Sequence, residues 1–140
     1  MSASNVELAR RSWDLPRHPE LLEELYSPDL VWHESDQDVR GYDGAREFIS
    51  GFVTGFPDIT ATVEDVFGDG DKVCTRWTLR GTHRGEFAGL SPTNRTVTMT
   101  GMTVHRIADG RIVEEWDAYD NLSLMQQVGA VPQPRASQEA

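Results

Sequence analysis

The first third of the chain carries a hydrophobic pattern typical of short helices. Apolar side chains recur at intervals of three and four residues in three segments, so that each segment would bury one face. The expected helices are 5–15, capped by Asn5, then 19–27, and 43–56, capped by Asp43. A proline follows each of them, and residues 30–33, between the second and third helix, have the composition of a short strand.

After residue 59 the pattern changes to the alternation typical of strands. Strands are expected over 59–64, 73–79, 95–107 and 111–119, with a last helix over 122–128. Helices followed by a run of antiparallel strands predict an α+β fold. We expect a curved, mainly antiparallel sheet packed against the N-terminal helices and enclosing a pocket. Residues 1–131 would form this single domain, and 132–140 a flexible C-terminal tail.

The turn at Asp109 and Gly110 decides which side chains share a face, because a one-residue slip inverts all of them. A two-residue loop would place Asp117 opposite Met102, whereas a three-residue loop with a glycine bulge would place it opposite Gly101. We favour the three-residue loop, which gathers an apolar face from Met102, Val104, Ile112 and Trp116. The other face then carries Gly101, Thr103, His105, Val113, Glu115, Asp117 and Tyr119, a mixture suited to the polar wall of a pocket.

Charge and composition narrow the range of partners. The 140 residues carry a formal net charge of −10, and the pI is about 4.7. An acidic surface repels phosphate groups, so neither nucleic acid nor an anionic membrane is an expected partner. The single cysteine, Cys74, allows no internal disulfide, and the N-terminus lacks the features of a signal peptide, so a cytoplasmic location is expected.

Three segments resemble the SnoaL-like polyketide cyclases. They are 81–95 (GTHRGEFAGLSPTNR), 102–120 (MTVHRIADGRIVEEWDAYD) and 126–129 (QQVG), and with Trp32-His33 the resemblance extends over about 6–131. It implies the cone-shaped fold of nuclear-transport-factor-like proteins, with a deep pocket between sheet and helices. It also implies a homodimer, or a higher homo-oligomer, formed through the outer face of the sheet.

The resemblance implies an activity as well. SnoaL-like cyclases close the last ring of aromatic polyketides by an intramolecular aldol reaction, and related members are hydroxylases of similar substrates. The acid/base aspartate of the cyclases aligns with Asp117. Their pocket histidine lies three residues before the arginine that matches Arg106; this chain has Thr103 there and His105 two residues later. The implied ligand is a small hydrophobic molecule, in particular an aromatic polycyclic one, with no cofactor.

Asp117 is the first candidate for a catalytic residue. Aldol closure requires a proton taken from carbon and a proton given to a carbonyl oxygen, and a carboxyl with a raised pKa is suited to both. The carbanion is delocalised over the conjugated substrate, so neither metal nor cofactor is expected. The alternatives are an ion pair of Asp117 with an arginine such as Arg106 or Arg76, or a position at the rim of the sheet.

Two histidines are further catalytic candidates. His33 would hold or protonate the substrate carbonyl at the pocket mouth, or merely cap the strand that ends there. His105 would share the face of Asp117, or be a surface residue opposite Val113. No spacing among the histidines and carboxylates matches a metal site.

Five residues are candidates for substrate binding: Trp13, Trp32, Thr103, Glu115 and Tyr119. The tryptophans would stack on an aromatic ligand or belong to the core, and the polar residues would orient Asp117 or face solvent. Three functions remain open: a polyketide cyclase, a cofactor-free hydroxylase or hydrolase of the same fold, and a non-catalytic binding protein. An exposed Asp117 without hydrogen-bond partners would favour the binding protein, whereas a dry pocket with Asp117 beside His33 or His105 would favour an enzyme.

Overall fold

The computed structural model describes residues 2–132. Its helices and strands follow in the order α1 (Ser2–Ser12), α2 (Leu21–Leu25), β1 (Tyr26–His33), β2 (Asp38–Arg40), α3 (Gly41–Gly55), β3 (Thr60–Asp69), β4 (Lys72–Thr82), β5 (Thr96–Ala108), β6 (Arg111–Tyr119) and α4 (Asn121–Gln127). Apart from Pro132, the predicted tail lies outside the described residues, and its flexibility stays a prediction. Among residues 2–132, no helix is both long and apolar enough to cross a membrane.

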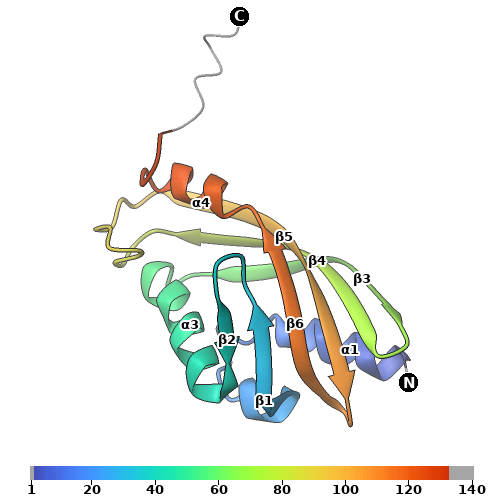
Figure 1. Ribbon diagram of the computed structural model, residues 1–140. Helices are drawn as coiled ribbons and strands as arrows, with labels where there is room; N and C mark the ends of the chain where they lie inside the picture. Colours follow the sequence, from blue (N-terminus) through green and yellow to red (C-terminus); the bar gives the residue numbers. More distant parts are fainter. Residues whose placement is uncertain (1, 133–140) are drawn as a thin grey trace, which may run out of the picture.

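One curved sheet of six strands forms the frame, in the order β2-β1-β6-β5-β4-β3 (Figure 1). Every neighbouring pair is antiparallel except β1 and β6, which run parallel. The helices α1 and α3 pack on the sheet through the apolar faces that the sequence predicted. The α+β fold with a curved, mainly antiparallel sheet on N-terminal helices is therefore confirmed.

The segment between the second and third helix differs from the prediction. The second helix ends at Leu25, and β1 begins at Tyr26, where the buried tyrosine pairs with Ile112 of β6. The pairing with β6 shifts between Tyr26 and Val31, a break that accommodates Pro28, whose nitrogen has no hydrogen to donate. The three-residue strand β2 was not predicted; it carries a single buried side chain, Val39, too little for a visible pattern.

The β5–β6 hairpin has neither of the two registers considered. Ala108 pairs with Arg111, so the loop has two residues, Asp109 and Gly110, both with positive φ, as a type I′ turn requires. The preferred three-residue loop is therefore wrong. An irregularity beside Val113 then shifts the pairing, so that Asp117 lies opposite Thr103.

That irregularity restores most of the expected faces; the exceptions are Ile112 and Val113, which was predicted on the polar face and is the extra residue without a partner in the ladder. Thr103 opposite Asp117, His105 opposite Glu115, and Gly101 opposite Tyr119 share one side of the sheet, as predicted. Ile112, expected on one face with Met102 and Trp116, is instead fully buried in the core opposite Ile107, because the register shifts between Ile112 and Glu114.

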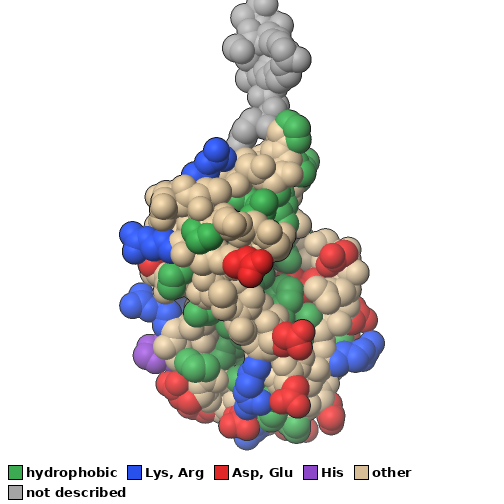
Figure 2. Space-filling view, turned by 90° about the vertical axis from the view of Figure 1, so that its left-hand side faces the viewer, with side chains coloured by type: hydrophobic (Ala, Val, Ile, Leu, Met, Phe, Trp, Pro, Cys, Tyr) green, Lys and Arg blue, Asp and Glu red, His purple; other side chains and the backbone are tan. Residues whose placement is uncertain are grey.

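Acidic and basic side chains are interspersed over the side of the molecule that carries α3 and the connection between β4 and β5 (Figure 2). That connection folds against the end of α3, where Phe87 contacts Gly55. His83 holds its two ends together: its backbone nitrogen donates to the Arg95 carbonyl, and its ring Nδ1 lies 2.9 Å from the Thr93 hydroxyl. His83 and Thr93 therefore fix the two ends of this connection relative to each other.

Gly101 in β5 provides the space that Trp77 occupies. A Cβ atom at Gly101 would lie 2.5 Å from Cζ2 of Trp77 and 2.7 Å from the Ala118 carbonyl oxygen. Trp77 is buried, and its indole nitrogen donates to Thr103 across 3.0 Å. A side chain at position 101 would therefore displace Trp77 from the group beside Asp117.

We expect Gly101→Ala to lower the free energy of unfolding by about 1–3 kcal/mol, because overpacking displaces the tryptophan. Urea denaturation followed by tryptophan fluorescence measures this change. Gly51→Ala is the matched control: it lies in α3, where an added methyl meets nothing within 4 Å. That change should raise stability by about 0.5–1 kcal/mol. Equal effects of the two substitutions would contradict the packing argument.

Candidate functional site

A cavity of about 110 Å³ lies between the concave face of the sheet and the helices. Most of its wall is apolar: α3 contributes Phe48, Ile49 and Phe52, the sheet contributes Trp32, Trp77, Leu79 and Met99, and the chain around α1 contributes Trp13, Leu15 and Pro16. The polar lining includes Glu34, Glu115, Asp117 and Tyr119. An apolar cavity with a few converging polar groups is the usual form of a small-molecule site.

Asp117 lies in β6 on the wall of this cavity, and two residues behind it fix its carboxyl group. The Thr103 hydroxyl donates a short hydrogen bond to Oδ1 of Asp117. Thr103 in turn accepts a hydrogen bond from the indole nitrogen of Trp77 at 3.0 Å. Because the indole group only donates, the threonine hydroxyl hydrogen is free to point at Asp117. The orientation of the carboxyl group is therefore set from the sheet side.

A second carboxyl group meets Asp117 from the turn between β1 and β2. Glu34 follows β1 directly and lines the same cavity, close enough to Asp117 to interact with its carboxyl group. The Tyr119 hydroxyl donates to Oε1 of Glu34 across 2.9 Å. Burial, together with the nearby charge of Glu34, raises the pKa of Tyr119, which keeps its hydroxyl a donor. Two carboxyl groups in hydrogen-bond contact require a proton between them.

The surroundings raise the pKa of Asp117 well above its ordinary value. Burial is the largest cause, followed by the negative charge of Glu115, and then by the hydrogen bond and charge of Glu34. The hydrogen bond from Thr103 acts in the opposite direction and is outweighed. Asp117 therefore keeps its proton at a higher pH than a solvated aspartate does.

Glu115 belongs to a buried network that connects α1 to the last strand. Its Oε2 accepts from the Tyr26 hydroxyl at 2.6 Å and lies 2.7 Å from Nδ1 of His105. The other ring nitrogen of His105 lies 2.9 Å from the Thr75 hydroxyl, which accepts from the indole nitrogen of Trp13 at 3.0 Å. Burial and the charge of Glu115 raise the pKa of Tyr26 well above its ordinary value, so the tyrosine stays protonated.

The structure brings most of the predicted site residues to this cavity, at two depths. Asp117, Glu115, Tyr119, Trp13 and Trp32 line it. Thr103 and His105 lie behind the lining, fully buried, so His105 is not the surface residue considered as its alternative. His105 contacts Glu115 and not Asp117. The catalytic and binding roles of these residues stay predictions.

His33 is not at the cavity, and its predicted place at the pocket mouth is wrong. It neighbours Trp32 on β1, and adjacent side chains of a strand point to opposite faces. Because Trp32 lines the cavity, His33 lies on the outer face, where it stacks on Trp116 with ring centroids 5.4 Å apart.

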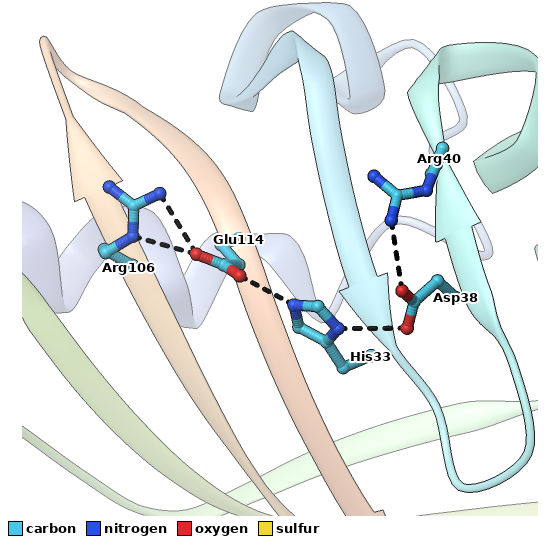
Figure 3. A network of polar contacts seen from close by, with 5 residues as sticks. All are labelled: His33, Asp38, Arg40, Arg106 and Glu114. Atoms are coloured by element: carbon cyan, nitrogen blue, oxygen red, sulfur yellow. Dashed lines mark hydrogen bonds and ion pairs between the residues drawn. The ribbon is translucent and has the colours of Figure 1, made fainter.

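On that outer face His33 is the centre of a polar network (Figure 3). Its Nε2 lies 2.6 Å from Glu114 and its Nδ1 lies 3.0 Å from Asp38. Arg106 pairs with Glu114, and Arg40 with Asp38. The hydrogen bonds to Glu114 and then to Asp38 raise the pKa of His33, because both ring nitrogens of a protonated histidine donate.

The alternative ion pairs of Asp117 are wrong as well. Arg106 pairs with Glu114, and Arg76 pairs with Asp65 at 2.7 Å. Both arginines lie on the outer face of the sheet, because their neighbours Thr75, Trp77 and His105 point inward.

Glu34 is the site residue that the sequence analysis missed. A signal was present: the alternation that places Trp32 inside also places Glu34 inside, two residues later. Asp120, by contrast, caps α4 by accepting from the Ser123 backbone nitrogen. Among residues 2–132, no group of three or more histidine, cysteine, aspartate or glutamate side chains is placed to hold a metal ion.

Comparisons with known proteins agree with this architecture. The sequence model of the SnoaL-like polyketide cyclases matches residues 6–128. IdmH of Streptomyces antibioticus, a candidate polyketide cyclase, is 34% identical, with a TM-score of 0.77 over 89% of this chain and 98% of its own. The comparison with curated proteins gave no significant match.

Two further solved structures are similar over nearly the whole chain. AclR of Streptomyces galilaeus, a candidate hydroxylase, is 28% identical, with a TM-score of 0.88 over 99% of this chain and 90% of its own. A candidate SnoaL-like polyketide cyclase from Jannaschia sp. is 28% identical, with a TM-score of 0.85 over 94% and 95% of the two chains. The cone fold is thus shared with proteins named for two different reactions.

The raised pKa of His33 predicts a pH-dependent contribution to stability. The contribution is complete below about pH 6.5, the pKa of an unfolded histidine, and is lost as the pH rises through the raised pKa of the folded protein. We therefore expect His33→Gln to lower the free energy of unfolding more at about pH 5.5 than at about pH 9. Urea denaturation at both pH values measures this difference. The exposed His18, replaced by glutamine, is the control; the same pH dependence in both variants would contradict the prediction.

Proposed function

Because the chain belongs to the SnoaL-like polyketide cyclase family, we propose that it catalyses an intramolecular aldol ring closure of an aromatic polyketide or a similar carbon acid. In this proposal the reaction uses no cofactor, and Asp117 is the acid/base group. The observation that carries the proposal is the position of Asp117 on the wall of an apolar cavity, where burial raises its pKa. A carboxyl group with a raised pKa is suited both to giving and to taking a proton.

The rest of the lining suits a flat, largely apolar substrate. Trp13 and Trp77 lie with ring centroids 4.9 Å apart, and Phe48 and Phe52 face the same cavity. Aromatic walls of this kind stack on aromatic rings and exclude water, which strengthens the interaction of Asp117 with a substrate carbonyl. The proposed ligand is therefore an aromatic polycyclic molecule.

The surroundings of Asp117 favour an enzyme over a binding protein. Its carboxyl group is half-buried, accepts a hydrogen bond from Thr103 and neighbours Glu34, so it is not without partners. Such fixed orientation is required for proton transfer and is unnecessary for holding an apolar ligand. A cofactor-free hydroxylase is the second candidate, because the chain is similar to AclR over 99% of its length.

We expect Asp117→Asn to reduce ring closure by about 10²–10⁴-fold, because the amide cannot exchange the proton. The measurement is product analysis with a methyl ester precursor of the anthracycline type, together with ligand binding. Asp109→Asn is the matched control: it lies in the exposed β5–β6 turn, where asparagine also tolerates the positive φ. Tight binding without any turnover by the wild type would overturn the cyclase proposal.

We also propose a homodimer, or a higher homo-oligomer, formed through the outer face of the sheet. Two large apolar side chains are open there, Met102 with 53% and Trp116 with 38% of their surface exposed. They come from the adjacent strands β5 and β6, and both point away from the cavity. Apolar side chains of this size on a sheet face are suited to a protein contact.

Met102→Glu should shift the protein toward the monomer, because it places a charge in the centre of that contact. Sedimentation velocity measures the shift. Phe67→Glu is the control, since Phe67 is equally apolar and 63% exposed but lies on the edge strand β3. A wild type that is monomeric at high protein concentration would contradict the proposed assembly.

A further inference from the structure

Glu34 and Asp117 form a pair of carboxyl groups inside the cavity, and each has its own hydrogen-bond donor. Tyr119 donates to Glu34, and Thr103 donates to Asp117. The contact between the two carboxyl groups has no donor of its own unless one of them is protonated. Both carboxyl groups line the same largely apolar cavity, and the charge of Glu34 is one of the causes that raise the pKa of Asp117.

We propose that this pair is the catalytic unit, in which Glu34 takes the proton from carbon while Asp117 gives its proton to the carbonyl oxygen. The proposal rests on the proposed function and adds to it a second catalytic residue, at a position that faces the same cavity.

The positions of the donors decide which partner holds the proton. Glu34 accepts a hydrogen bond from Tyr119, which orients its carboxyl group in the cavity as the role of the base requires. Asp117 lies beside the buried carboxylate of Glu115, whose Oε2 has two donors, Tyr26 and His105. A negative charge at Glu115 favours the neutral form of its neighbour, in agreement with the raised pKa of Asp117.

The titratable groups near Asp117 come from every strand that packs against it. They are Tyr26 of β1, Glu34 after β1, His105 of β5, and Glu115 and Tyr119 of β6. From α3 the cavity receives only apolar side chains among the described residues. The proton therefore moves within the pair or to the substrate.

The reaction is balanced with a single proton in the pair. The carbon–hydrogen bond breaks, its proton goes to Glu34, and its electron pair forms the new carbon–carbon bond. The carbonyl double bond opens, and its oxygen takes the proton of Asp117 to become a hydroxyl group. Glu34 is then protonated and Asp117 ionised, and one transfer across their hydrogen bond restores the starting state.

The first test needs no substrate. Carbon-13 NMR follows the carboxyl resonance of Asp117 during a pH titration, assigned by its loss in Asp117→Asn. In Glu34→Gln we expect this titration to shift to lower pH, because a neutral amide replaces the carboxylate that shares the proton. Asp36→Asn is the matched control: it removes one charge from the same turn, two residues away, at an exposed position. Equal titration curves in the two variants would overturn the shared proton.

A second variant covers the case in which Glu34→Gln does not fold. Tyr119→Phe removes the donor to Glu34 and leaves both carboxyl groups in place. Releasing Glu34 from Tyr119 should change its contact with Asp117, seen as a change in the carboxyl shift of Asp117 at neutral pH. An unchanged shift would contradict the coupling of the two carboxyl groups.

The second test separates the two roles. In heavy water, Asp117→Asn should keep exchanging the acidic carbon-bound hydrogen of the methyl ester precursor while ring closure is lost. Glu34→Gln should lose both by about 10²-fold or more, because it lacks the base. The opposite result, with exchange lost only in Asp117→Asn, would overturn the assignment of the base to Glu34. A wild type that neither exchanges nor closes would overturn the proposed function, and the NMR comparison would still decide on the shared proton.

Discussion

The extra residue that β6 carries at Val113 is the constraint on which the polar wall depends. A two-residue turn alone would set Asp117 against Met102, and the irregularity moves it opposite Thr103. The same shift leaves Ile112 in the core and turns Glu115 to the cavity, three residues later. A bulge re-aims the side chains of one strand without breaking the ladder, and here it joins an apolar core to a polar site within one strand.

The polar wall is stable because its charges are matched by donors. Burying a carboxylate is costly unless hydrogen bonds replace the lost water. Glu115 accepts hydrogen bonds from Tyr26 and His105. Glu34 accepts one from Tyr119, and Asp117 accepts one from Thr103. Asp117 has fewer donors than acidic neighbours: one hydroxyl donor, Thr103, faces the charges of Glu115 and Glu34. The carboxyl group whose ionised form is least favoured, that of Asp117, therefore lies at the cavity wall, where a substrate would contact it.

Periodicity in the sequence was sufficient for the helices and strands, and for the inward face of the last hairpin. Periodicity did not predict three features that depend on local backbone geometry: the length of the loop at Asp109, the start of β1 at Tyr26, and the three-residue strand β2. His33 was predicted at the pocket mouth from the chemistry of its side chain. Strand alternation from Trp32 places His33 on the outer face and Glu34 on the inner one. The contacts of Glu34 could not be predicted, since they join residues 34, 117 and 119 across a parallel strand pair.

The hydrogen bond from Trp13 to Thr75 connects the end of the N-terminal helix to the polar side chains of β6. Trp13 directly follows α1, and Thr75 supports His105, which supports Glu115. Shortening the protein at its N-terminus would therefore do more than expose a few apolar side chains. It would release His105, weaken the hold on the Glu115 carboxylate and alter the proton affinity of Asp117, although α1 touches none of the reacting atoms.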